Sequence, residues 1–334
     1  MTKRSIFKTE TARRDAAQFF RKLALTRETM SRAGHMSNTN TAGGYLVGEE
    51  LSSTIESIAE AHGLIPSYAR NNVMKGDMLR ISRRNVPATF HFTAQAETAA
   101  ETEVNYGMTN HVAKKVMGFI PVTNELLDDA ENCADDIALA FGEGLAALVD
   151  EVGFAGDGSE DHGGMTGLAT LLQDGNHAGG VAAAAGHNTL LEVDATDLTN
   201  LVAALPTRAA KNAAWYCSHF AAAKVFYRLA AGGGGIGINA AGEPTFWGKP
   251  IRETPTLPAV DSSLTGAAMI LFGDLRQSTS YAIRRGLQIG ASALGLTWEH
   301  DITKFRAKAR FDVIHSDIGD SETAGATVAL IGTA

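Results

Sequence analysis

Residues 79–113 read LRISRRNVPATFHFTAQAETAAETEVNYGMTNHVA, and this stretch decides the fold. Residues 89–93 are strand-like, and residues 104–112 alternate with the period of two that is typical of a β-strand. Between them, residues 94–103 are small, polar and acidic and offer nothing bulky to pack. The stretch therefore predicts a long hairpin with a bare tip. Because an isolated hairpin is marginally stable and its open edges invite another chain, we expect a neighbouring subunit to cover it.

A long helix is expected after the hairpin. Gly142 and Gly144 interrupt it, which predicts either a bend or a close contact with another helix. Acidic residues stand in its first turn, where the helix dipole favours them. The apolar residues that recur every three or four positions are Leu126, Ala130, Cys133, Ile137, Phe141, Leu145, Leu148 and Val152.

The remainder of the chain alternates helices with short strands. A half-buried strand is expected near the C-terminus, where Phe305, Ala307, Ala309, Phe311 and Val313 face inwards. The residues between them, which we expect on its exposed face, are Arg306, Lys308, Arg310 and Asp312. A last apolar strand is predicted at residues 327–331.

Charge is distributed unevenly along the 334 residues. Residues 1–40 carry nine Lys and Arg against three Asp and Glu, a net charge of +6, whereas the whole chain has −8. Within this N-terminal arm, Ala16, Phe19, Phe20 and Leu23 recur at helical spacing. The arm either contacts an anionic partner or is a solvated helix face. The excess of acidic residues in the rest of the chain, residues 41–334, argues against a general nucleic-acid-binding protein.

Composition excludes several classes of protein. The chain is 45% hydrophobic with only two cysteines, so neither a disulfide framework nor a structural zinc site is expected. No apolar run reaches the roughly 18 residues of a membrane span. No secretory apolar stretch follows residues 1–5, and we expect folding in a reducing cytoplasm.

The most enzyme-like motif is the glycine run at residues 232–237, which satisfies GxGxxG. Dinucleotide binding requires this motif to leave a strand and open a helix, whereas here it follows an expected helix. Residues 157–161 resemble a calcium loop but lack its glycine and its bidentate glutamate. Cys133 lies on an apolar helix stripe, which indicates a buried thiol. We therefore predict no catalytic, cofactor-binding or metal-ligating residues.

The order of short motifs resembles that of the major capsid proteins of tailed bacteriophages, and this resemblance implies an α+β fold of the Hong Kong 97 type. No single motif is specific, but their joint order over residues 43–330 is. The matching segments are GGYLV (43–47), EEL (49–51), the hairpin, FIPVTNELL (119–127), FAGDG (154–158), residues 163–168, residues 215–223, WGKPI (247–251), LFGDL (271–275) and residues 305–313.

The resemblance implies domain boundaries. Residues 1–43 would be an N-terminal arm, residues 79–113 the extended hairpin loop, and residues 166–285 the axial domain. Three stretches would form a discontinuous peripheral domain with a long spine helix: 44–78, 114–165 and 286–334.

The resemblance also implies a virion structural protein rather than an enzyme. Many copies would assemble in the host cytoplasm, as hexamers and pentamers, into an icosahedral shell that holds double-stranded DNA non-specifically. A portal protein, a scaffolding protein and a maturation protease are possible further partners, and no membrane is implied. Covalent cross-linking through a loop lysine, known in some relatives, is not expected, because residues 79–113 contain no lysine.

The acidic tip of the hairpin suggests a specific contact between subunits. It carries Glu97, Glu101 and Glu103 and no cation, whereas the closing strand carries cations. We expect the tip to dock on a basic surface of a neighbour. The candidate contact residues are Phe90, Phe92, Glu97, Glu101, Glu103, Tyr106, Arg306, Lys308 and Arg310. An encapsulin-like compartment and, from another class, a nucleotide-dependent enzyme are the alternatives.

Overall fold

The computed structural model describes residues 55, 57–59, 62–84, 92, 106–129, 133–233, 235–292 and 301–334. Its strands are β1 (Arg70–Val73), β2 (Met78–Arg84), β3 (Tyr106–Val112), β4 (Lys114–Thr123), β5 (Gly180–Ala182), β6 (Ala214–Cys217), β7 (Ile236–Ile238), β8 (Pro244–Phe246), β9 (Lys249–Glu253), β10 (Ala268–Gly273), β11 (Thr279–Ser292), β12 (Ile302–His315) and β13 (Thr327–Ile331). Its helices are α4 (Leu64–Tyr68), α5 (Asn124–Asp129), α6 (Cys133–Ala155), α7 (Leu168–Leu172), α8 (Ala195–Ala204), α9 (Thr207–Ala210), α10 (His219–Ala221), the π-helix η1 (Ala222–Tyr227), α11 (Arg228–Gly233) and α12 (Leu275–Ser278).

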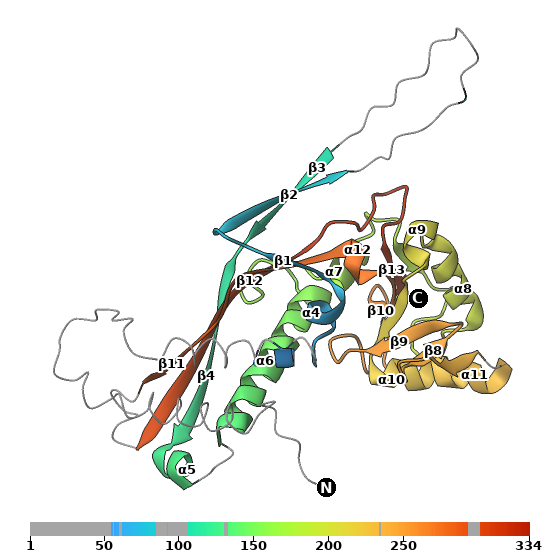
Figure 1. Ribbon diagram of the computed structural model, residues 1–334. Helices are drawn as coiled ribbons and strands as arrows, with labels where there is room; N and C mark the ends of the chain where they lie inside the picture. The colour runs from blue at the N-terminus through green and yellow to red at the C-terminus, as the bar shows by residue number, and fades with distance from the viewer. Residues whose placement is uncertain are drawn as a thin grey trace.

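One layer of the molecule is a four-stranded sheet in the order β1-β11-β12-β4, with α6 packed along one of its faces (Figure 1). The alternation in β12 sends Phe305, Ala307 and Phe311 into the core, each 5% exposed or less. Phe305 and Ala307 meet Ile137 and Phe141 of α6 in one hydrophobic cluster. The half-buried strand expected from the sequence is therefore confirmed for these residues.

The second layer is a seven-stranded sheet in the order β5-β13-β10-β6-β9-β8-β7. Its core surrounds Trp215, whose indole N–H donates to the carbonyl of Phe246 over 3.1 Å. The ring of Trp215 packs on Phe272 with centroids 4.2 Å apart and on Phe226 at 5.2 Å. Since buried aromatic clusters dominate core energetics, this cluster gives the second sheet its own core.

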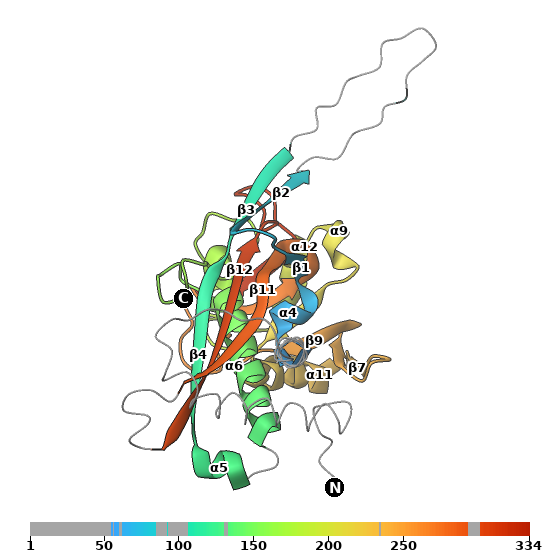
Figure 2. The ribbon, with the colours of Figure 1, turned by 60° about the vertical axis from the view of Figure 1, so that its left-hand side comes forward.

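The third sheet is the pair β2-β3, which projects from the body (Figures 1 and 2). The strands pair antiparallel, from Met78 opposite Val112 to Arg84 opposite Tyr106. The predicted hairpin is thus confirmed at its base. The strand expected at residues 89–93 lies outside the described residues, except for Phe92, which is not in a strand.

Two stretches lie in a different sheet from the one expected. Residues 286–334 are expected in the peripheral domain, but β13 pairs with β10 in the seven-stranded sheet. Residues 166–285 are expected in the axial domain, but β11 begins at Thr279 and pairs with β12. Four residues of β13, Thr327–Leu330, are buried, which suits an inner strand covered on both faces. The other boundaries stay predictions.

The expected spine helix is described on both sides of residues 130–132, as α5 and α6, and its longer part is α6. Residues 130–132 themselves lie outside the described residues. The carboxylate of buried Asp150 in α6 accepts hydrogen bonds of 2.8 Å from the amides of Leu64 and Ile65 and so caps α4. Burial raises the pKa of Asp150. No helix in the described part of the chain is long and apolar enough to cross a membrane.

The two glycines of α6 have opposite surroundings, which generates a test of the packing. A methyl group on Gly142 would lie 2.6 Å from Cγ2 of Ile58, whereas one on Gly144 would meet no atom of the described residues within 4 Å. Gly142→Ala should therefore destabilise the protein by about 1–3 kcal/mol through overpacking. Gly144→Ala should stabilise it by up to about 1 kcal/mol through helix propensity. Denaturant unfolding measures both, and equal effects would contradict the close contact at Gly142.

Candidate inter-subunit interface

The base of the hairpin is attached to the body through a buried histidine. His111 of β3 is 0% exposed. Its Nδ1 lies 3.0 Å from the carboxylate of Asp312, and its Nε2 lies 2.9 Å from the hydroxyl of Ser280. The amide of Val112 donates to the same Asp312 oxygen over 3.0 Å. Since Ser280 and Asp312 belong to β11 and β12, these bonds fasten the hairpin to the four-stranded sheet.

A fourth side chain extends this network. The side-chain amide of Asn72 donates to the Ser280 hydroxyl over 2.8 Å, so Asn72, Ser280, His111 and Asp312 form one chain of hydrogen bonds. Asp312, expected on the exposed face of its strand, is instead 4% exposed, because the base of the hairpin covers it. Sequence alternation alone could not anticipate that cover.

The turn before β2 makes a second, more exposed attachment. The carboxylate of Asp77 accepts hydrogen bonds from Arg284 and, over 3.2 Å, from Arg310. The amide of Ala113 donates to the Asp77 carbonyl over 3.0 Å. Because Asp77 is 72% exposed at its side chain, its ion pairs are worth about 0–1 kcal/mol each. The buried His111 network is therefore the stronger anchor.

Both at its base and further out, the hairpin leaves apolar side chains in solvent. Met108 is 65% exposed, Met78 52% and Val112 41%. In the described part of the chain, no third strand pairs with either edge of β2-β3. Exposed edges and apolar side chains on a two-stranded ribbon are typical of a surface that another chain covers.

A basic surface lies on the face of the four-stranded sheet opposite α6. The register pairs Phe119 of β4 with Arg306 of β12, and Met117 with Lys308. Directly opposed residues in a sheet share a face, and Phe119 and Met117 are exposed. We call this surface the basic-aromatic face; its members are Lys304, Arg306, Lys308, Arg310, Met117 and Phe119. Lys304, Met117 and Phe119 were not among the residues predicted from the sequence, although the alternation of residues 114–123 was a signal for the last two.

The predicted contact residues have different outcomes. Phe90, Glu97, Glu101 and Glu103 lie outside the described residues. Phe92 is fully exposed. Tyr106 opposes Arg84 across the hairpin. On β12, Arg306 is exposed, whereas Lys308 and Arg310 are half-buried. That any of these residues touches a neighbour stays a prediction.

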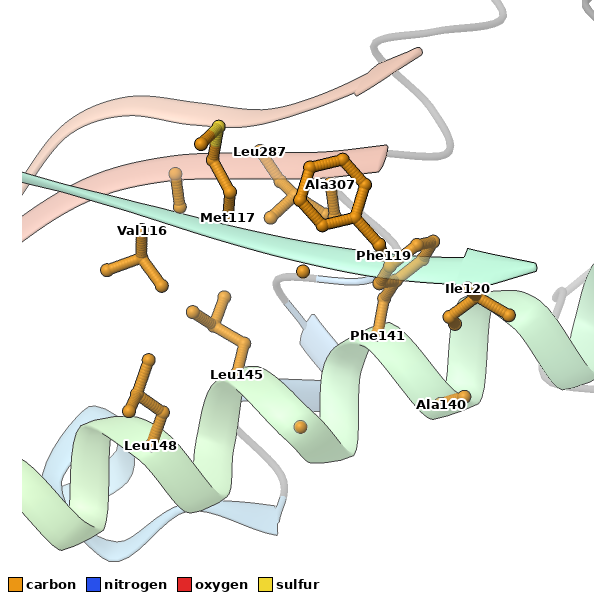
Figure 3. Close-up of a pocket in the computed structure, with 13 residues that line it drawn as sticks. Val116, Met117, Phe119, Ile120, Ala140, Phe141, Leu145, Leu148, Leu287 and Ala307 are labelled. Carbon is orange, nitrogen blue, oxygen red and sulfur yellow. The ribbon is translucent and has the colours of Figure 1, made fainter. Parts of the chain in front are cut away.

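An apolar groove runs between β4, the edge strand of its sheet, and α6 (Figure 3). It has a volume of about 270 Å³. Val116 points from β4 towards Leu145 of α6, as Figure 3 shows. We call it the edge groove; the lining residues that matter below are Val116, Gly118, Ile120, Phe141, Gly144, Leu145 and Leu148. Sequence reasoning did not predict it.

A possible metal-binding cluster has a structural explanation. His187, Asp194 and Asp197 bring potential ligand atoms within 4.8 Å of one another. Asp194 and Asp197 form a capping box at the start of α8. Buried Asp197 also contacts Nδ1 of His187 at 2.6 Å and accepts from the amide of Ala184 at 2.9 Å. Burial raises the pKa of Asp197, but these hydrogen bonds outweigh it and lower the pKa overall. The cluster therefore anchors the loop before α8.

The enzyme-like features of the sequence do not assemble into a site. Most of the glycine motif is used by secondary structure, since α11 continues to Gly233 and β7 begins at Ile236. The motif therefore does not connect a strand to a helix. Both cysteines are buried, and burial raises the pKa of the Cys133 and Cys217 thiols. Such thiols are poor nucleophiles.

Comparison with known proteins decides the family. The sequence profile of the phage capsid family matches residues 43–315. The chain belongs to the phage capsid family. No curated protein sequence matches it significantly.

Solved structures show the same fold at low sequence identity. The capsid protein of an empty GTA particle has a TM-score of 0.61 and 15% identity, covering 92% of this chain and 97% of its own. The structure from Microbacterium phage Oxtober96 has a TM-score of 0.55 and 15% identity, and the match covers 81% of this chain and 91% of that one. The holo-SrpI encapsulin complex of Synechococcus elongatus has a TM-score of 0.51 and 14% identity, and the match covers 79% of this chain and 84% of that one. The Hong Kong 97-type α+β fold expected from the motif order is thus confirmed, and this phage capsid protein is a structural component of a virion.

The His111 anchor is testable by substitution. His111→Ala leaves the buried Asp312 carboxylate without its imidazole partner and should lower the free energy of unfolding by about 1–3 kcal/mol. Amide hydrogen exchange in β3 should accelerate as well. Asn110→Ala, at an exposed position beside it in β3, is the matched control. Equal stability and exchange in the two variants would contradict the anchor.

Buried His315 should make the stability of the protein depend on pH. This histidine pairs with Thr279 across β12 and β11, and burial lowers its pKa from 6.5 to about 4. The unfolded chain therefore takes up this proton first, so stability is complete above pH 6.5 and is lost as the pH falls towards 4, by about 1.4 kcal/mol per unit. His315→Gln, which does not titrate, should show a shallower loss. Unfolding of both proteins at about pH 7, 5.5 and 4.5 measures it; identical pH dependence contradicts it.

Proposed function

We propose that this capsid protein assembles as hexamers and pentamers into an icosahedral shell that encloses double-stranded DNA. The observation that carries the proposal is the projecting hairpin, which exposes Met78 and Met108 and pairs with no third strand among the described residues. A neighbouring subunit is the natural cover for such a ribbon. Each contact is modest, but closure of the shell makes their sum nearly irreversible.

The contact that we propose joins the hairpin tip of one subunit to the basic-aromatic face of the next. The tip carries Glu97, Glu101 and Glu103 and no Lys or Arg from residue 94 to 105. On the basic-aromatic face, Arg306 is exposed beside Phe119. Opposite charges provide register and specificity, and the exposed aromatic ring adds apolar contact area. Exposed pairs are worth about 0–1 kcal/mol each, so repetition over a shell supplies the strength.

The remaining partners follow from the same proposal. The chain has a net charge of −8, which favours a container that holds DNA without gripping it through counterion release. Assembly would take place in the host cytoplasm. A portal protein, a scaffolding protein and a maturation protease would act on the shell as a whole.

A compartment that encloses enzyme cargo is the second candidate, because an encapsulin shares the fold. Genomic neighbours distinguish the two. Portal and terminase genes beside this one favour the virion, and a cargo-enzyme gene favours the compartment.

The proposed contact predicts a charge-reversal result. The triple change of Glu97, Glu101 and Glu103 to Lys should abolish or strongly reduce shell formation, seen by negative-stain microscopy and sedimentation, while the subunit stays folded. Like charges at the contact would replace opposite ones. Adding Arg306→Glu and Lys308→Glu to the triple variant should restore assembly in part.

The matched control reverses three exposed acids outside the hairpin: Glu160→Lys, Asp161→Lys and Glu322→Lys. It changes the net charge equally and should assemble normally. Normal shells from the hairpin variant, or equal failure of the control, would refute the contact.

A further inference from the structure

The exposed face of α6 beside the edge groove has an unusual composition. Its exposed residues include Ala140, Gly144 and Ala147, which recur at helical spacing and leave the backbone accessible. Within the described part of the chain, a methyl group on Gly144 would meet no atom within 4 Å. Small side chains in a row allow another helix to approach closely, and the groove beside them provides apolar surface to bury.

The same face is acidic. Residues 124–155 contain nine Asp and Glu and no Lys, Arg or His. Asp136 and Glu143 are exposed beside the small residues, and no described cation pairs with either. A partner for this face therefore needs cations on its flanks and bulky apolar groups at its centre.

The N-terminal segment of this chain has that chemistry. Phe19, Phe20 and Leu23 recur at helical spacing, and Arg13, Arg14, Arg21 and Lys22 flank them. We propose that residues 13–23 dock as an amphipathic helix on α6, with a phenylalanine ring in the edge groove and the cations beside Asp136 and Glu143. This is a helix-in-groove interaction. A cavity of about 150 Å³ holds a benzene ring, so a groove of about 270 Å³ accommodates a phenylalanine side chain.

The acidic hairpin tip does not fit this site, because Asp136 and Glu143 would repel it. The two sides of β4 thus select different segments: the basic-aromatic face selects the acidic tip, and the edge groove selects the basic arm. Reach does not restrict the arm, since residues 24–54 can span up to about 100 Å when extended. The same copy or a neighbour can supply it.

The test fills the groove without disturbing the fold. Gly144→Phe places a ring over the small-residue row, where no described residue occupies the space. In the full-length protein, amide hydrogen exchange of residues 13–23 should become roughly tenfold faster than in the unsubstituted protein, as expected for a released segment. Gly144→Ala is the matched control and should keep the protection. Circular dichroism verifies that α6 stays helical in both.

A second pair of variants tests the charges. Asp136→Lys with Glu143→Lys should also release residues 13–23, whereas Glu160→Lys with Asp161→Lys, equally exposed and outside the α6 face and the groove lining, should not. Exchange of residues 13–23 that is the same in the unsubstituted protein, Gly144→Phe and the acidic-face variant would overturn the proposal. Because the readout is protection of the arm and not shell formation, it fails separately from the proposed function.

Discussion

A two-stranded ribbon cannot bury its own side chains, and this constraint governs the rest of the molecule. Among the described residues, the body holds β2-β3 at its base, through the buried His111 network and the exposed ion pairs of Asp77. Above that base, apolar side chains such as Met108 stand in solvent. A rigid, buried anchor makes the direction of the hairpin definite, while its surface remains available to another chain. The fold therefore presents a directed arm instead of a closed globule.

The four-stranded sheet complements that arm because its two sides differ in charge. In β12, residues that face α6 are apolar and make the core, and the alternate residues form a row of cations. In β4, the same alternation adds Met117 and Phe119 to the cationic side. The helix on the other side is acidic. One edge strand thus separates surfaces of opposite charge, and each can select a different segment of the same sequence.

The sequence was sufficient for the features that depend on local periodicity. The hairpin base, the alternation of β12 and the burial of Cys133 follow from apolar spacing, and the structure has them. It was insufficient where contacts between distant segments determine whether a residue is buried or which strands pair. Asp312 has the spacing of an exposed residue but is buried by a segment 200 residues away. The place of strand β13 in the seven-stranded sheet was not predicted, because pairing between strands that are far apart in the sequence leaves no local signal. The edge groove was missed for the same reason.

The central claim is that the hairpin obtains its stability from another subunit. Amide hydrogen exchange of β2 and β3 in assembled shells, compared with unassembled subunits of the same preparation, tests it most directly. The account predicts that assembly slows exchange in both strands by at least roughly an order of magnitude, with little change in buried β6 and β10. Equal protection of β2 and β3 in a lone subunit and in the shell would contradict it.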